Sequence, residues 1–313
     1  MQHDATTETV SFTSADGKTE IHGVIWWPEG EPRGVVQLVH GMAEYIMRYE
    51  PFARFIKEKG YVVSGHDHLG HGKSVASKED WGRIPAREGC DILVGDVGRM
   101  RGLVHERVDA GLPHFLFGHS MGSFVVRVYL SECGFNLAGA IICGTGHIPP
   151  ATSSAGNMLA RLIAKTRGED YVSKLLGDLS VGAYAKAIDN PRTELDWLSY
   201  NAKNVDDYIA DEQCGFAFSA GGNATLTALT LKACSPACFK GIPNELPLLF
   251  IAGDGDPVGN MGEGVRTAVG MAEKSGSIDV TCTIYPHMRH EILNETNGKY
   301  VMQDIASWME ARI

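Results

Sequence analysis

The chain has 313 residues, of which 44% are hydrophobic, so it can bury a sizeable core and by length alone holds about two domains. The formal net charge of −10 argues against nucleic acid as a partner and against electrostatic binding to anionic lipid. The first eight residues lack the basic and apolar regions of a signal peptide, and no stretch approaches the ~18 apolar residues that span a bilayer.

The cysteines favour a reducing compartment. They number seven and are scattered along the chain, which does not suggest a disulfide framework, so we expect a cytoplasmic protein. Cys234 and Cys238 are four residues apart, but no second Cys or His pair lies nearby to complete a tetrahedral zinc site. We therefore expect neither a metal nor another cofactor.

The first half of the chain alternates strands and helices. Asp16-Gly17 separates two strand-like runs, 10–13 and 20–27, and predicts a hairpin. Nearly continuous apolar runs then indicate parallel strands that are covered on both faces. These runs lie at 34–40, 61–64, 115–117 and 137–143, and helices are expected near 49–59, 91–110 and 123–133.

The pattern changes between residues 147 and 240. Helical stretches such as 155–166 and 170–176 follow one another there without buried strands, and prolines flank the segment. The alternation then resumes, with strands at 248–252 and 278–285, a helix at 264–274, and a C-terminal helix that begins at His290. The sequence therefore predicts an α/β protein with a mostly parallel central sheet and helices on both faces. Its core comprises residues 1–146 and 241–313, and residues 147–240 form an inserted helical cap.

A serine lies between one of these strands and the next helix. Gly118-His119-Ser120-Met121-Gly122 matches G-x-S-x-G, in which a sharp turn presents the serine at the tip of the sheet. Gly118 and Gly122 leave room where a Cβ would clash with a neighbouring strand or helix. Ser120 is therefore the candidate nucleophile.

A serine nucleophile needs a histidine base, and the histidine needs a carboxylate that orients it. Reacting groups of a parallel sheet gather at the carboxyl ends of its strands. Asp254 and Asp256 follow one late strand, and His287 and His290 follow the last. We favour Asp256, because it lies further along the loop, and His290, because His287 sits closer to the strand.

The same reaction needs two backbone N–H groups to hold an oxyanion. One comes from the residue after the nucleophile, Met121, and the other from the loop after the third strand, at Met42. The dipeptide His40-Gly41 lets that loop bend toward Ser120.

Several stretches together resemble the α/β-hydrolases, and specifically the monoacylglycerol lipase and lysophospholipase branch. His40–Tyr49 resembles H-G-x-x-E-H-x-x-R-Y, Asp67–Ser74 resembles D-x-x-G-H-G-x-S, and Gly253–Asp256 aligns with G-x-x-D, which also selects Asp256. His290 aligns with the final histidine of that family. The resemblance covers the core and implies the α/β-hydrolase fold and a Ser120–His290–Asp256 triad.

Other residues of these motifs are expected to support the site. Tyr45 stands where the family usually has histidine, and Met42 is bulkier than the residue often found there. Glu44 is expected to brace the oxyanion loop, and His119 to serve packing. We expect the glycine-rich loop that follows the next strand to be structural, with its polar side chains satisfying backbone groups. These side chains are Asp67, His71 and Ser74.

The sequence therefore predicts a serine ester hydrolase for a small acyl ester or lipid, by resemblance a monoacylglycerol or lysophospholipid. Apolar residues of the cap either line an acyl pocket or form a small core of their own, and the cap could contact a membrane transiently. These residues are Met158, Leu159, Leu162, Leu175, Leu176 and Leu179.

Two alternatives stay open. A proline-type aminopeptidase would bind the substrate amine through cap carboxylates, and another acyl hydrolase would share the triad. A non-catalytic binding protein on the same scaffold would commonly lack a triad member, whereas this chain has candidates for all three. The carboxylates in question are Asp206, Asp207, Asp211 and Glu212.

Overall fold

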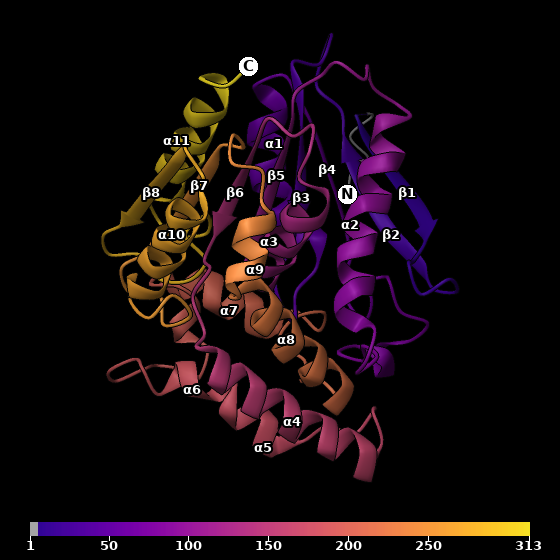
Figure 1. Cartoon of the computed structure of the whole chain (residues 1–313), viewed down its shortest axis with the longest axis vertical. Helices are drawn as coiled ribbons and strands as arrows, with labels where there is room; N and C mark the ends of the chain where they lie inside the picture. Colours follow the sequence, from indigo (N-terminus) through magenta and orange to yellow (C-terminus); the bar gives the residue numbers. More distant parts are fainter. Residues whose placement is uncertain (1–5) are drawn as a thin grey trace.

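A computed structural model describes residues 6–313, which form an eight-stranded sheet flanked by helices (Figure 1). The expectation of no signal peptide falls partly on residues 1–5, outside the described residues. The strand order is β1-β2-β4-β3-β5-β6-β7-β8, in which β1 and β2 pair antiparallel, β2 and β4 pair antiparallel, and every other pair is parallel. The strands are β1 (Thr7–Thr13), β2 (Glu20–Trp26), β3 (Gly34–Val39), β4 (Tyr61–His66), β5 (His114–His119), β6 (Gly139–Cys143), β7 (Leu248–Gly253) and β8 (Val280–Tyr285).

Helices cover both faces of this sheet because the strand side chains alternate between two apolar clusters. Phe115 and Phe117 of β5 pack with α1 and α11, whereas Leu116 packs on the other face with α2, α3 and α10. The core helices are α1 (Glu50–Glu58), α2 (Gly89–His105), α3 (Met121–Cys133), α10 (Glu263–Ser275) and α11 (Gly298–Glu310). The predicted mostly parallel α/β architecture is confirmed.

Six α-helices lie between β6 and β7. In Figure 1, α4, α5 and α6 lie beyond the end of the sheet at which the parallel strands finish. Leu229 of α8 and Phe239 of α9 instead belong to the same buried cluster as α3, so the last part of this segment packs into the core. The six are α4 (Pro150–Arg167), α5 (Lys174–Leu179), α6 (Val181–Ala185), α7 (Ala202–Ala210), α8 (Ala220–Ala233) and α9 (Pro236–Gly241).

Four expected helix boundaries are wrong. The helix predicted at 155–166 already begins at Pro150. The helix predicted at 91–110 ends at His105, and turns follow it. The helix predicted at 170–176 begins only at Lys174, because the Ser173 hydroxyl caps its first turn. His290 does not begin a helix: it lies in a loop of turns, and α11 starts at Gly298. None of the helices in residues 6–313 is long and apolar enough to cross a membrane.

Candidate active site

Ser120 lies at the turn between β5 and α3. Its backbone has φ 54° and ψ −120°, a combination that side-chain-bearing residues rarely adopt. The Ser120 amide donates to the Cys143 carbonyl at 3.0 Å. A Cβ on Gly118 would lie 2.5 Å from the Gly122 carbonyl oxygen, and a Cβ on Gly122 would strike the Val39 carbonyl. Both glycines therefore allow the close packing that holds the strained serine, as their spacing predicted.

His290 and Asp256 form a buried pair. His290 Nδ1 lies 3.0 Å from each Asp256 carboxylate oxygen, and the two side chains are 2% and 0% exposed. The Val258 amide donates to Asp256 Oδ1 at 2.9 Å and fixes the carboxylate in the loop after β7. Because an ionised carboxylate only accepts hydrogen bonds, the histidine proton lies on Nδ1, and Nε2 is left free to accept one.

The rival residues Asp254 and His287 lie together on the surface. The His287 amide donates to Asp254 Oδ1 at 2.9 Å, and both residues are exposed. This contact closes the turn between their loops. The geometry therefore pairs Asp256 with His290 and leaves Asp254 and His287 outside the buried pair.

A cavity of about 560 Å³ is lined by Ser120, His290, Met42 and Met121 together. The Trp197 ring packs beside the His290 ring, with their centroids 5.1 Å apart. The rest of the wall is mostly apolar and includes Phe124, Ile148, Leu159, Leu176, Leu179, Leu198 and Leu226.

The expected apolar pocket residues divide into two groups. Leu159, Leu176 and Leu179 line the cavity, as predicted. The prediction is wrong for the others, which face away from the cavity: Met158, Leu162 and Leu175 are 74%, 56% and 53% exposed. The inner side of α4 is instead occupied by small alanines, which allow it to pack closely on α8.

The loop after β3 places the Met42 amide beside the cavity. Glu44 Oε1 accepts from the Gly41 amide at 2.6 Å, and Ala43 adopts a positive φ of 53°. No hydrogen bond among the described residues uses the Met42 amide. Met121 is the first residue of α3, where the N–H has no partner within the helix. Both amides are therefore open to a ligand near Ser120.

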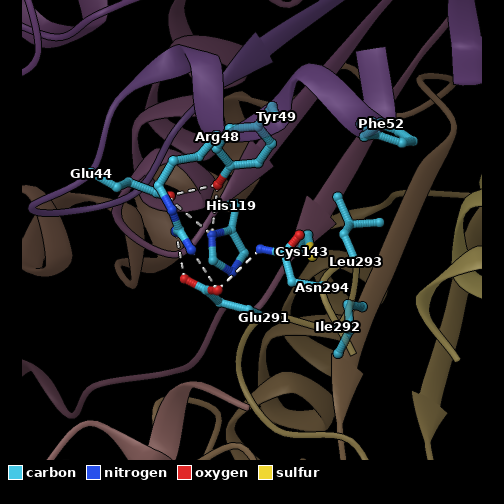
Figure 2. Close-up of a pocket in the computed structure, with 10 residues that line it drawn as sticks. All are labelled: Glu44, Arg48, Tyr49, Phe52, His119, Cys143, Glu291, Ile292, Leu293 and Asn294. Atoms are coloured by element: carbon cyan, nitrogen blue, oxygen red, sulfur yellow. Dashed lines mark hydrogen bonds and ion pairs between the residues drawn. The ribbon is translucent and has the colours of Figure 1, made fainter. Parts of the chain in front are cut away.

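A polar network at the wall of the cavity was not predicted (Figure 2). Arg48 bridges Glu44 at 2.8 Å and Glu291 at 2.7 Å, and the Tyr49 hydroxyl lies between Glu44 and His119. The i, i+4 spacing of Glu44 and Arg48 was a usable signal, whereas nothing in the sequence indicated contact with Glu291. His119 makes hydrogen bonds here, so its expected role in packing alone is wrong.

The loop 67–74 has the expected structural role. Asp67 accepts from the Ile46 amide at 2.8 Å and from the Lys73 amide at 2.9 Å, and Ser74 Oγ donates to the Asp67 carbonyl at 2.7 Å. His71 Nδ1 donates to the Leu69 carbonyl at 3.1 Å. Asp67, His71 and Ser74 do not line the cavity.

Helix α7 and the segment after it contact the loop that carries Met42. The hydroxyl of Tyr208 and the amide of Gly215 both donate to the Ala43 carbonyl, at 2.7 and 2.9 Å. Tyr45, which departs from the family pattern, donates to Asp211 Oδ2 at 2.7 Å and so also links this loop to the segment after α7.

The acidic residues considered for an aminopeptidase do not face the cavity. Each carboxylate is paired elsewhere: Asp206 with Arg192, Asp207 with Lys203, Asp211 with Tyr45, and Glu212 with Lys78. In residues 6–313, no group of three or more His, Cys, Asp or Glu side chains is arranged to hold a metal ion.

The sheet order and the serine on a strained strand-to-helix turn define an α/β-hydrolase fold. The family model described as serine aminopeptidase, S33, matches residues 30–297, and the chain belongs to this family of hydrolases.

Relatives place the chain near the monoacylglycerol lipases. It is 29% identical over 306 residues to the monoacylglycerol lipase of Mycolicibacterium smegmatis, with 97% of each chain covered. It is 27% identical over 297 residues to the human monoglyceride lipase, with 92% of this chain and 86% of the relative covered.

Solved structures show the same fold. A thermostable carboxyl esterase from Bacillus coagulans, in complex with glycerol, superposes with a TM-score of 0.91 at 30% identity, with 98% of each chain covered. A soluble variant of the monoglyceride lipase from Saccharomyces cerevisiae, at 18% identity, has a TM-score of 0.77 and covers 100% of this chain and 97% of its own.

Proposed function

We propose that this protein is a serine ester hydrolase that cleaves monoacylglycerols, with lysophospholipids as a second ester class. One observation carries the proposal: His290, which is paired with the buried Asp256, lines the same apolar cavity as Ser120. The activities named for the relatives support the choice of an acylglycerol ester.

In the proposed mechanism, Ser120 Oγ attacks the ester carbonyl while His290 Nε2 takes its proton. Asp256 holds the imidazolium that forms, and the Met42 and Met121 amides bind the oxyanion. Collapse of this intermediate breaks the ester bond, and His290 protonates the departing alcohol. Water then attacks the acyl-enzyme with His290 as base and releases the acid.

The cavity wall supports an acyl chain as the bound group. Leu159, Leu176 and Leu226 offer apolar surface, and burying a methylene there contributes about 0.8 kcal/mol. Residues 147–240 would then form a cap over the acyl site. A location in the cytoplasm remains a prediction.

The outer face of the cap supports transient contact with a lipid surface. Met158, Leu162 and Leu175 are exposed there, and α4, which carries the first two, also exposes Arg161 and Lys165. Apolar side chains with neighbouring cations suit the headgroup boundary of a lipid aggregate. This proposal concerns docking only, because ester cleavage takes place in the cavity.

A p-nitrophenyl ester series from acetate to palmitate, followed by monoacylglycerol and lysophospholipid, tests the proposal. Wild type should hydrolyse the esters, and Ser120→Ala should lose roughly six orders of magnitude in turnover. The optimal chain length then measures the acyl site. A folded protein that cleaves proline anilides but no acyl ester would favour the aminopeptidase, and inactivity on both would favour a binding protein.

A further inference from the structure

A cluster of charged and titratable side chains, Glu44, Arg48, Tyr49, His119 and Glu291, is buried beside the proposed site (Figure 2). The Glu44 and Glu291 side chains are each 4% exposed, and within residues 6–313 only Arg48 forms ion pairs with both. One guanidinium cannot neutralise two buried carboxylates. A second positive charge would balance the cluster, and His119, 7% exposed, is the group in position to carry it.

The hydrogen bonds of Tyr49 bear on this charge. Its hydroxyl oxygen lies 2.7 Å from Glu44 Oε1 and 2.8 Å from His119 Nδ1, and it has only one proton to donate. If that proton goes to Glu44, the hydroxyl must accept a proton from His119 Nδ1. In the opposite arrangement, two oxygens would face each other at 2.7 Å with no proton between them unless Glu44 were protonated.

Glu44 is surrounded by donors that favour its ionised form. The Gly41 amide donates to Oε1 at 2.6 Å, and Arg48 donates to Oε2 at 2.8 Å. Burial opposes its charge, but the hydrogen bond with His119 and the charge of Arg48 outweigh burial and hold the pKa of Glu44 well below its usual range. Glu44 therefore accepts the Tyr49 proton as a carboxylate.

The second nitrogen of His119 also carries a proton. Nε2 lies 3.2 Å from the main-chain oxygen of His290, and a carbonyl oxygen can only accept. With Nδ1 donating to Tyr49 and Nε2 donating to His290, both ring nitrogens are protonated. Burial disfavours this charge, but the hydrogen bond and the charge of Glu44 outweigh burial and raise the pKa of His119.

We propose that His119 is a positioning residue held as an imidazolium, which ties the oxyanion loop to the main chain of the base His290. The link runs from Gly41 through Glu44 and Tyr49 to His119. The role of His119 in catalysis rests on the proposed function, whereas the positive charge on His119 does not depend on that function.

The His119 ring also packs beside the base: the His119 and His290 ring centroids lie 4.7 Å apart. The titratable and charged groups that face His119 from the surrounding elements are His40, Glu44, Arg48, Tyr49, Cys143, His290 and Glu291.

The charge can be read directly from the proton–nitrogen NMR spectrum of histidine side chains. The full chain is measured at pH 8, where a histidine with the ordinary pKa of about 6.5 is neutral. We expect the His119 ring to show protons on both nitrogens, with its signals assigned by their loss in His119→Asn. Tyr49→Phe, which perturbs the same signals, provides the assignment if the asparagine variant does not fold.

A charge variant tests the cause. Glu44→Gln should lower the His119 titration midpoint, because the carboxylate that favours the imidazolium is gone. Glu50→Gln removes the same charge from a solvent-facing pair with Arg54 and should leave the midpoint unchanged. A neutral His119 ring in wild type at pH 8 would overturn the proposal, whether or not the protein cleaves esters.

The positioning role has a kinetic signature. His119→Asn should lower kcat on a short p-nitrophenyl ester by about 10- to 100-fold with little change in KM, because misplacing a reacting group by about 1 Å costs up to 100-fold. Wild-type kcat should also decline as alkaline pH deprotonates His119, and the variant should lack that decline. A wild-type kcat and pH profile in a folded His119→Asn protein would contradict the role in catalysis.

Discussion

At the residue scale, two aspartates and two histidines of identical chemistry follow the last strands, and their surroundings separate them. Asp256 and His290 are buried against each other, whereas Asp254 and His287 meet at the surface through a backbone amide. Each candidate for the reaction therefore has a matched control within a few residues of it.

The histidines give the first test. His290→Ala should lower turnover on p-nitrophenyl esters almost as far as Ser120→Ala does, by roughly six orders of magnitude, because the proposed mechanism uses His290 as its base. His287→Ala should retain turnover within a few-fold of wild type. If His287→Ala lost activity instead, the assignment of His290 as the base would be wrong.

The aspartates give the second test. Asp256→Asn should lower kcat by about 10,000-fold, because an amide favours the wrong histidine tautomer. Asp254→Asn removes the same charge at the surface and should have little effect. Comparable kcat values for the two variants, with both proteins folded, would be incompatible with the proposed triad.

At the element scale, the loop that carries Met42 is held between α7 with the segment after it and the buried network. Tyr45 donates to Asp211, and Tyr208 of α7 donates to the carbonyl of Ala43, the residue after Met42. The helices between β6 and β7 are thus part of the support of this loop, and a change in their contacts should affect the proposed reaction.

Tyr45→Phe tests this coupling. Loss of one hydrogen bond of about 1 kcal/mol should lower kcat by up to about 10-fold with KM little changed. Tyr300→Phe is the control, because Tyr300 is 71% exposed on α11, far along the chain from this loop. If kcat is the same in Tyr45→Phe and Tyr300→Phe, the bond does not position the loop.

The exposed cap face has its own test. Leu162→Ser should keep the rate on water-soluble p-nitrophenyl acetate but lower the rate on monoacylglycerol in vesicles by roughly 10-fold, since a buried leucine contributes about 1.5–3 kcal/mol. Ile278→Ser, at a residue 77% exposed outside the cap, serves as the matched control. Equal vesicle rates for both variants would rule out docking through this face.

At the scale of the whole molecule, buried histidines link stability to pH. Burial lowers the pKa of each below the ordinary 6.5, to about 3 for His66 and His71. The unfolded chain therefore gains protons that the folded chain does not bind, and stability falls as the pH drops from 6.5 toward about 3. The histidines concerned are His40, His66, His68, His71 and His114.

Two other groups affect the pH dependence of stability with the opposite sign. Burial raises the pKa of Asp96 to about 6 from 3.8, so its contribution to stability grows as the pH falls through that range. The raised pKa of His119 gives stability that is lost as the pH rises through its folded value. The histidines outnumber these groups, so we expect a net loss of stability below pH 6.5.

His66→Leu isolates one contribution. Neither ring nitrogen of His66 has a hydrogen-bond partner among the described residues, so leucine removes a titration without breaking a bond. The free energy of unfolding, measured in urea between pH 6.5 and 4.5, should change with pH less steeply in His66→Leu than in wild type, by up to about 1.4 kcal/mol per pH unit. A pH dependence of unfolding in His66→Leu equal to that of wild type would contradict the linkage.

The sequence by itself determined the sheet, its helices and the turn that carries Ser120. Continuous apolar runs indicate strands that are buried on both faces of the sheet, and G-x-S-x-G indicates a local turn conformation. Both features depend on residues that are neighbours in the sequence. The buried strands were therefore placed closely, whereas the helix expected at His290 was wrong, because Glu295 of the loop there accepts from the amide of the distant Tyr200.

Only the tertiary structure decided which side chains share a site. The contact of Arg48 with Glu291 spans 243 positions, and the contact of His119 with the His290 carbonyl spans 171. No local pattern encodes such contacts. The orientation of α4 was decided in the same way: its alanines pack on α8 and turn Met158 and Leu162 outward, because close helix packing needs small residues at the interface.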